Sequence, residues 1–220
     1  DEVGGITINY REYLKDVIAP DDASFHNTSM EINPGLVESF PFLSSLAGQF
    51  ENYQFHKLVY SFISNVESDA TGNGINGEVL GTSNDNPLSP MFTSKRDMMQ
   101  YQNTENGKIT ESLVVGVECD PFKMKGDGLK LVRTTQAPPR ADLQEYDMGT
   151  YQLAFNNTAT NYRSIAVGEL WVEYSVTLSK VLVSRIPTQL RCAMLYQENS
   201  TAMSYNNAAP LLVTDPSTGL

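Results

Sequence analysis

The chain has 220 residues, an apolar fraction of 40% and a formal net charge of −11 at neutral pH. This length is enough for one domain with its own hydrophobic core and an additional tail. Because contacts to phosphate need Lys and Arg, the acidic balance argues against a nucleic-acid-binding surface over most of the domain. No apolar run reaches the roughly 18 residues that indicate a membrane-spanning helix, so we expect no membrane partner. The chain starts at Asp1 without a signal peptide, which we interpret as a processed or trimmed form.

Eight segments combine strand-forming residues with the apolar and polar alternation of a half-buried strand. In chain order, they are 6–17, 29–32, 53–63, 78–82, 113–119, 129–134, 151–155 and 169–180. In the third segment, the apolar phase shifts near Lys57 and Leu58, which predicts a β-bulge. In the last segment, Trp171 falls on the polar face, so we expect it to pack against a loop or a neighbouring subunit.

Two short helices are expected between these strands. In the segment 41–50, the apolar residues share one helical face, and Pro41 suits the first turn. The segment 95–101 follows Ser94, which forms a variant of the capping box with Asp97. The strands do not alternate with long amphipathic helices, so the pattern favours an all-β sandwich or barrel. We expect one domain over 1–180 and a C-terminal arm or tail over 181–220.

Several motifs occur together in an order and spacing that one group of proteins shares. They are Arg11-Glu12-Tyr13, Asn33-Pro34-Gly35, Phe40-Pro41-Phe42-Leu43 with Ala47, Tyr53 with Phe55, and Gly168-Glu169-Leu170-Trp171 with Tyr174. With these motifs, the segment 6–180 resembles the jelly-roll capsid proteins of circular, replicase-encoding single-stranded DNA viruses, the circovirus-like group. It is also similar to the related coat proteins of tombus- and sobemo-like plant viruses, which have RNA genomes.

The resemblance implies an eight-stranded antiparallel jelly-roll sandwich made of two sheets, B-I-D-G and C-H-E-F. It assigns the eight predicted strands, in chain order, to B, C, D, E, F, G, H and I. The helix at 41–50 then connects C to D. In this arrangement, the motif residues have structural roles.

The resemblance also implies a function, which is self-assembly into an icosahedral virion. A shell of about sixty copies, with a triangulation number of one, is expected around a nucleic-acid genome. The family's basic N-terminal arm, which neutralises the genome, does not occur in this chain, and we expect it to precede Asp1 in the natural gene. Assembly is expected in the host cell, with the nucleus as a candidate compartment, and a host receptor is expected but not specified.

The sequence lacks the motifs of catalysis, so we expect no enzymatic activity. His26 and His56 are the only histidines, and neither lies in a nucleophile, phosphate-loop or zinc-binding pattern. Cys119 and Cys192 lack metal-ligand spacing and are interpreted either as free thiols or as a disulfide pair. No cofactor is expected except calcium, which loop carboxylates suit as oxygen ligands. The candidate calcium ligands are Asp21, Asp22, Asp85 and Asp120.

Two other functions stay open at this point. A lectin-like jelly-roll binding module would need an exposed aromatic platform, for which Trp171 and loop tyrosines are the candidates. A secreted trimeric signalling jelly roll would need a signal peptide. Both alternatives predict small oligomers, whereas a capsid protein predicts closed particles.

Overall fold

The computed structural model describes residues 5–67, 77–123, 128–137 and 141–182. The chain divides into two units, and the described residues all belong to the first, Asp1–Arg185. The arm or tail predicted for 181–220 lies outside the described residues beyond Leu182, and so does Cys192. Both of these predictions therefore stay untested. Within the described ranges, no helix has both the length and the apolar character that crossing a membrane requires.

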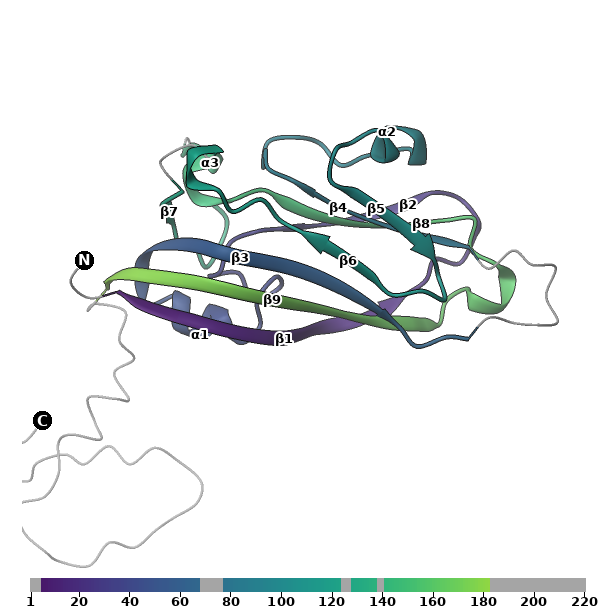
Figure 1. The fold of residues 1–220 in the computed structure, drawn as a ribbon, viewed down its shortest axis with the longest axis horizontal. Coiled ribbons are helices and arrows are strands. Elements are labelled where there is room, and N and C mark those ends of the chain that lie inside the picture. The colour runs from purple at the N-terminus through teal and green to yellow at the C-terminus, as the bar shows by residue number, and fades with distance from the viewer. Residues whose placement is uncertain (1–4, 68–76, 124–127, 138–140, 183–220) are drawn as a thin grey trace, which may run out of the picture. The chain divides into compact units, whose positions relative to one another are not determined.

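The described residues form two antiparallel sheets, which Figure 1 shows as two layers. The first sheet has the order β1-β9-β3-β6, with strands β1 (Ile6–Ile18), β9 (Ala166–Val181), β3 (Phe50–Ser64) and β6 (Leu113–Gly116), and β7 (Lys130–Leu131) also pairs with β3. The second sheet has the order β2-β8-β4-β5, with strands β2 (His26–Glu31), β8 (Thr150–Asn156), β4 (Glu78–Asn84) and β5 (Thr104–Lys108). These orders correspond to B-I-D-G and C-H-E-F, so the predicted all-β jelly-roll sandwich is confirmed.

Alternation along the strands places the apolar core between the two sheets. On β9, the side chains of Leu170, Val172 and Val176 are fully buried, as the period-two pattern predicts. The ring of Tyr60 on β3 stacks on the ring of Tyr151 on β8, with centroids 4.1 Å apart, and so joins the two sheets. The two apolar faces remove each other from water, which stabilises the sandwich.

One strand assignment within the sandwich is wrong, and one strand is missed. The segment 113–119, predicted as strand F, forms β6 only as far as Gly116 and pairs with β3, so it occupies the G position. The F position belongs to β5, which pairs with β4 and is not predicted by the sequence pattern. Because β5 is polar along its length and lies at the edge of its sheet, it lacks the apolar alternation that identifies a strand.

The outer edge of the first sheet consists of two pieces. β6 pairs with residues 59–62 of β3, and β7 pairs with Asn52 and Tyr53 near its start. The strand predicted over 129–134 is therefore reduced to Lys130–Leu131. Beyond it, the backbone N–H of Val132 still donates to the Glu51 carbonyl on β3, whereas the N–H of Arg133 donates to the side chain of Asn33. A short 3-10 turn, Pro121–Lys123, lies between the two pieces.

The predicted helices are present but short. α1 (Leu43–Ala47) covers only the middle of the segment 41–50, because Phe50 already belongs to β3. Phe42, expected on the buried face of this helix, is 47% exposed and packs against Tyr10. α2 (Lys95–Met99) follows Ser94, whose hydroxyl oxygen accepts the N–H of Asp97, so the predicted cap is confirmed.

Two further local features bear on the sequence predictions. The register between β3 and β9 shifts between Phe55 and Lys57, which confirms the predicted bulge. α3 (Leu143–Tyr146) follows Asp142, whose carboxylate accepts the N–H of Gln144. This helix and the 3-10 turn Thr160–Tyr162 are too short to produce a recognisable apolar period, so the sequence does not predict them.

Candidate functional site

The motif Arg11-Glu12-Tyr13 lies on β1, where alternation sends its members to opposite faces of the sheet. Glu12 points into the sandwich, is only 5% exposed, and accepts the N–H of Phe42 on its Oε2 at 2.7 Å. Burial raises the pKa of Glu12, and hydrogen bonds from the backbone of Phe42 and Leu43 oppose that rise. The motif therefore connects β1 to the segment that begins α1.

The motif Asn33-Pro34-Gly35 is held by one buried side-chain amide. The Nδ2 of Asn33 donates to the carbonyls of Leu131 at 3.1 Å and Tyr146 at 2.9 Å. Its Oδ1 accepts the backbone N–H groups of Gly35 at 3.1 Å and Arg133 at 3.2 Å. A Cβ on Gly35 would lie 2.4 Å from the Arg133 carbonyl oxygen, so the chain requires glycine there. The motif thus joins β7 to the loops that follow β2 and α3.

A buried ion pair lies beside this amide. The guanidinium of Arg133 donates from Nε and Nη2 to the two carboxylate oxygens of Asp147, and from Nη2 to Oε2 of Glu31, each at 2.7 Å. Burial alone would lower the pKa of Arg133, but the hydrogen bonds to Asp147 and Glu31 raise it, so the guanidinium stays charged. Burial raises the pKa of Asp147, and the hydrogen bonds from Arg133 oppose that rise. Sequence reasoning missed this network, because its members are far apart in the chain and share no motif spacing.

Most of the other motif residues belong to the core or to close backbone contacts. The buried ones are Pro34, Phe40, Leu43, Ala47, Tyr53, Phe55, Gly168, Leu170 and Tyr174. The ring of Phe40 stacks on that of Phe55 at 5.5 Å, and the hydroxyl of Tyr53 donates to the Tyr146 carbonyl at 2.6 Å. Pro41 and Phe42 are exposed. The structural role expected for the motif residues therefore agrees with these contacts.

Four motif residues lie on the opposite, outward face of the first sheet. The ring of Tyr13 meets the ring of Trp171 edge to face at 5.6 Å, and the Arg11 guanidinium lies 5.0 Å from the Trp171 centroid. The indole Nε1–H of Trp171 donates to Oε2 of Glu169 at 2.8 Å. Trp171 therefore packs against β1 of its own subunit, and not against the loop that was one expectation for it.

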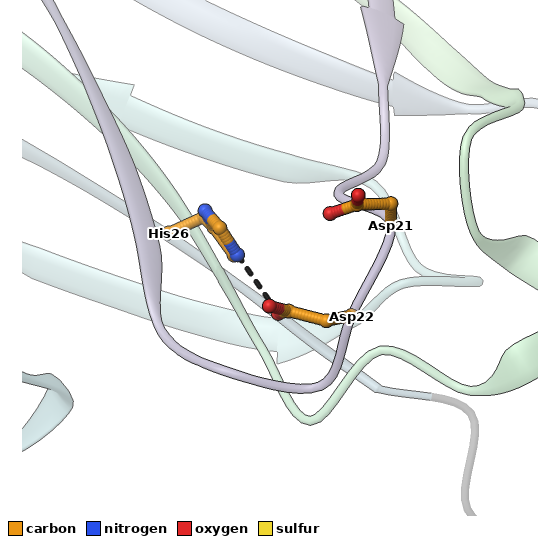
Figure 2. A group of neighbouring side chains, drawn as sticks. All are labelled: Asp21, Asp22 and His26. Atoms are coloured by element: carbon orange, nitrogen blue, oxygen red, sulfur yellow. Dashed lines mark hydrogen bonds and ion pairs between the residues drawn. The ribbon is translucent and has the colours of Figure 1, made fainter.

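Only two of the four candidate calcium ligands come together. Figure 2 shows Asp21, Asp22 and His26, which lie where the chain passes from β1 to β2. Their possible ligand atoms all lie within 4.8 Å of one another, and all three side chains are exposed. The His26 Nε2 lies 2.8 Å from Oδ1 of Asp22. Hydrogen bonds from Ser24, followed by the one from His26, lower the pKa of Asp22 to about 2.

This cluster is an incomplete site for calcium on a single protomer. Calcium takes six to eight oxygen ligands, whereas a histidine nitrogen suits transition metals better. The other candidates, Asp85 and Asp120, are not members of the cluster, and Oδ1 of Asp120 accepts the backbone N–H of Phe122 at 3.0 Å. Of the four candidate ligands, only Asp21 and Asp22 therefore lie together, and calcium binding stays a prediction.

The remaining reactive side chains have ordinary surroundings. The Nε2 of His56 lies 2.7 Å from the hydroxyl of Thr177 on the neighbouring strand. Within the described part of the chain Cys119 has no disulfide partner, and its burial, followed by the nearby Glu118 and Asp85, raises its pKa to about 12. A thiol with that pKa is protonated at neutral pH and is a poor nucleophile.

Comparison with protein families gives one match, to the family described as viral coat protein (S domain), over residues 6–182. No curated protein matches the chain in sequence. The matched range covers both sheets, from the first strand to the last.

Solved virus structures share the fold at low sequence identity. The structure of cucumber necrosis virus has a TM-score of 0.68 and 19% identity, over 81% of this chain and 57% of that one. Mud crab tombus-like virus gives 0.63 and 14% over 81% and 90%, and cocksfoot mottle virus gives 0.66 and 8% over 81% and 85%. The chain therefore spans little more than half of the cucumber necrosis virus chain. These matches support the tombus- and sobemo-like part of the sequence resemblance, while the circovirus-like part stays a prediction.

Proposed function

The chain belongs to the viral coat protein family, matching its S domain, and on this premise we propose that it is a structural capsid protein of a virion. Copies of the chain assemble into a closed shell around a nucleic-acid genome. The observation that carries the proposal is the B-I-D-G and C-H-E-F sandwich, which is formed by the residues that match the family. The role is structural and not enzymatic, because the motif residues act through buried contacts that hold the strands together.

Exposed apolar side chains support self-assembly. The side chain of Phe122 is 97% exposed, and Val37, Ile18, Leu88 and Val114 are each more than half exposed. Burial of such side chains in contacts between subunits removes apolar area from water and favours association. The net charge of −11 opposes it, because acidic protomers repel each other. Assembly should therefore strengthen as added salt screens this repulsion.

The direct test is negative-stain electron microscopy of the purified protein, combined with size-exclusion chromatography over a series of salt concentrations. Uniform round particles that elute ahead of the protomer would support the proposal. Monomers or trimers at every salt concentration would contradict it and would favour the lectin-like binding module. A glycan array would then be the next measurement.

The size of the shell and its contents are finer proposals. We propose about sixty copies in closed icosahedral symmetry, which native mass spectrometry of intact particles would count. The resemblance to circovirus-like capsid proteins predicts single-stranded DNA as the genome. Nucleic acid extracted from particles would then be degraded by DNase and resist RNase, and the reverse result would assign an RNA genome. Assembly in the nucleus would be tested by microscopy of cells that express the chain.

Calcium binding is proposed only between copies in the shell. Asp21 and Asp22 supply two carboxylates on an exposed loop, so a neighbouring copy would have to provide the missing oxygen ligands. A chelator should then lower the melting temperature of particles and leave that of free protomers unchanged. An unchanged melting temperature for both, or an equal response in the Asp21→Asn/Asp22→Asn variant, would eliminate this site.

A further inference from the structure

The outward face of the β1-β9-β3-β6 sheet carries an aromatic and basic cluster that does not contribute to the core. Strand register places Tyr13, Trp171, Ser61 and Val114 in one row across four strands. Tyr13 is 42% exposed and Val114 59% exposed, so this row is open to solvent at both ends. Together with Arg11, Tyr13 and Trp171 form what we call the Trp171 platform.

The platform has space around it. In the next row of the same face, Arg11 and Glu173 pair with Val59 and Gly116. A Cβ placed on Gly116 would meet no atom within 4 Å. Short side chains on two of the strands therefore leave the plane of the sheet accessible to a flat ligand.

Two cations border the platform. The Arg11 guanidinium lies over the Trp171 ring and opposite Glu173 in the strand register; after the hydrogen bond from Lys57, the charge of Arg11 contributes to the lowered pKa of Glu173. Lys57 pairs with Glu173 at 2.5 Å, with both side chains about half exposed. A shallow depression of about 430 Å³ lies between these cations and is also lined by Asn9, Ser175 and the acidic Glu173. Its size and its donors suit a phosphate next to a base.

We infer that this face binds single-stranded nucleic acid, with a base stacked on Trp171 and the adjoining phosphates on Arg11 and Lys57. The inference rests on the proposed capsid function, because it identifies the surface of the shell that faces the genome. Aromatic side chains that alternate with cations form sequence-tolerant platforms for single strands, since every base has a π-face. The contact between Arg11 and the half-buried Trp171 ring is weak, so a base can replace the guanidinium, which then turns to a phosphate.

The carboxylates on this face do not prevent such binding. Glu173 lies between two cations, since it pairs with Lys57 and faces Arg11 in the strand register, and Glu169 accepts the indole N–H of Trp171. The face is therefore close to neutral in a chain whose formal net charge is −11, and it repels phosphate less than the average surface does. Each copy binds a single strand weakly, and a shell that presents many copies to the same strand binds it with higher overall affinity.

Trp171 is the only tryptophan in the chain, so its fluorescence reports on this site alone. The protein, held in one assembly state as verified by electron microscopy, is titrated with single-stranded oligo-dT and, separately, with oligo-U. We expect saturable quenching with both, weakened by salt, and much less quenching by a duplex of the same length. A labelled strand that binds without quenching, equal quenching by the duplex, or no binding at all would each overturn the inference.

Point variants distinguish the contribution of base stacking to binding from the contribution of charge. Trp171→Leu should weaken binding of a labelled single strand about ten-fold without changing the salt slope, and Trp171→Phe should restore it. Arg11→Ala should weaken binding several-fold and reduce the salt slope by about one phosphate contact. Arg96→Ala, on exposed α2 beside the other sheet, is the matched control and should behave like the unaltered protein. An effect of Arg96→Ala equal to that of Arg11→Ala would overturn the inference.

The two proposals fail in different ways. If no particles form but Trp171 is quenched by single strands, the capsid function is wrong and the binding face stands. If particles form and package nucleic acid while Trp171 stays unquenched, the capsid function stands and the genome contacts lie elsewhere.

Discussion

Arg133 donates two parallel hydrogen bonds to the carboxylate of Asp147, from Nε to Oδ1 and from Nη2 to Oδ2, both at 2.7 Å. Asp147 is fully buried and Arg133 is 7% exposed. The same guanidinium reaches Glu31 at the end of β2, and the amide of Asn33 donates to Asp147 at 3.2 Å. This ion pair therefore links the end of β2, in the second sheet, to the segment that follows β7.

Removing one partner of this pair should be costly. We expect Arg133→Leu to lower the free energy of unfolding by about 3–5 kcal/mol, because the Asp147 carboxylate is left buried without a counter-charge. Urea unfolding of the unassembled protein measures the loss. Lys57→Met, which breaks the half-exposed pair with Glu173, should cost less than about 1 kcal/mol. Similar losses in the two variants would contradict the role assigned to the buried pair.

Gly35 should not tolerate a side chain. A Cβ there would lie 2.4 Å from the Arg133 carbonyl oxygen and 2.7 Å from a methyl carbon of Val132, so we expect Gly35→Ala to destabilise the protein by about 1–3 kcal/mol. Gly116→Ala is the matched control, since its Cβ has open space and glycine is unfavourable within a strand. Thermal unfolding measures the melting temperatures of both variants. Equal melting temperatures for Gly35→Ala and Gly116→Ala would contradict the close contact predicted between a Cβ at position 35 and the Arg133 carbonyl oxygen.

Glu12 should make stability depend on pH in an unusual direction for a carboxylate. Burial raises its folded-state pKa above the ordinary 4.5, so the folded protein binds this proton more tightly than the unfolded chain. The contribution of Glu12 to stability is therefore greatest below the ordinary pKa of 4.5 and falls as the pH rises through the higher folded-state pKa. Glu12→Gln keeps an oxygen acceptor for the Phe42 N–H and does not titrate.

We accordingly expect Glu12→Gln to gain stability relative to the unaltered protein as the pH rises from about 4.5 towards neutrality. Glu12→Ala, which removes the acceptor, should instead lose about 1–3 kcal/mol at neutral pH. Urea unfolding at a series of pH values gives both differences. A constant difference between Glu12→Gln and the unaltered protein at every pH would show that the pKa of Glu12 is not raised.

Phe122 should act in assembly and not in folding. Its side chain is 97% exposed in the protomer, so Phe122→Asp should leave the melting temperature of the protomer unchanged. Particle yield should fall, because an interface that buries this ring gains up to about 3 kcal/mol per copy. Phe122→Tyr preserves the ring and should assemble normally. Analytical ultracentrifugation measures the yield, and full assembly of Phe122→Asp would show that the ring lies outside every subunit contact.

The sequence by itself determined the strands that have a buried face. Along β1, β3 and β9, apolar residues repeat with period two, because one face must leave water, and the bulge near Lys57 is visible as a break in that period. The same alternation places Glu12 inward and both Arg11 and Trp171 outward. Local capping chemistry was equally readable at Ser94, because a cap needs only neighbours in the chain.

Only the tertiary structure decided the contacts that join distant segments. The polar β5 is a strand because β4 offers it a free edge, and β6 joins the opposite sheet from the one predicted, since strand pairing depends on backbone hydrogen bonds that any sequence can form. Arg133, Asp147 and Glu31 come from separate segments that meet only in the folded structure, and no spacing in the sequence predicts their contact. The apolar periodicity of the sequence indicates which side chains are buried. The partners of a buried charge or of an edge strand are determined by the folded geometry.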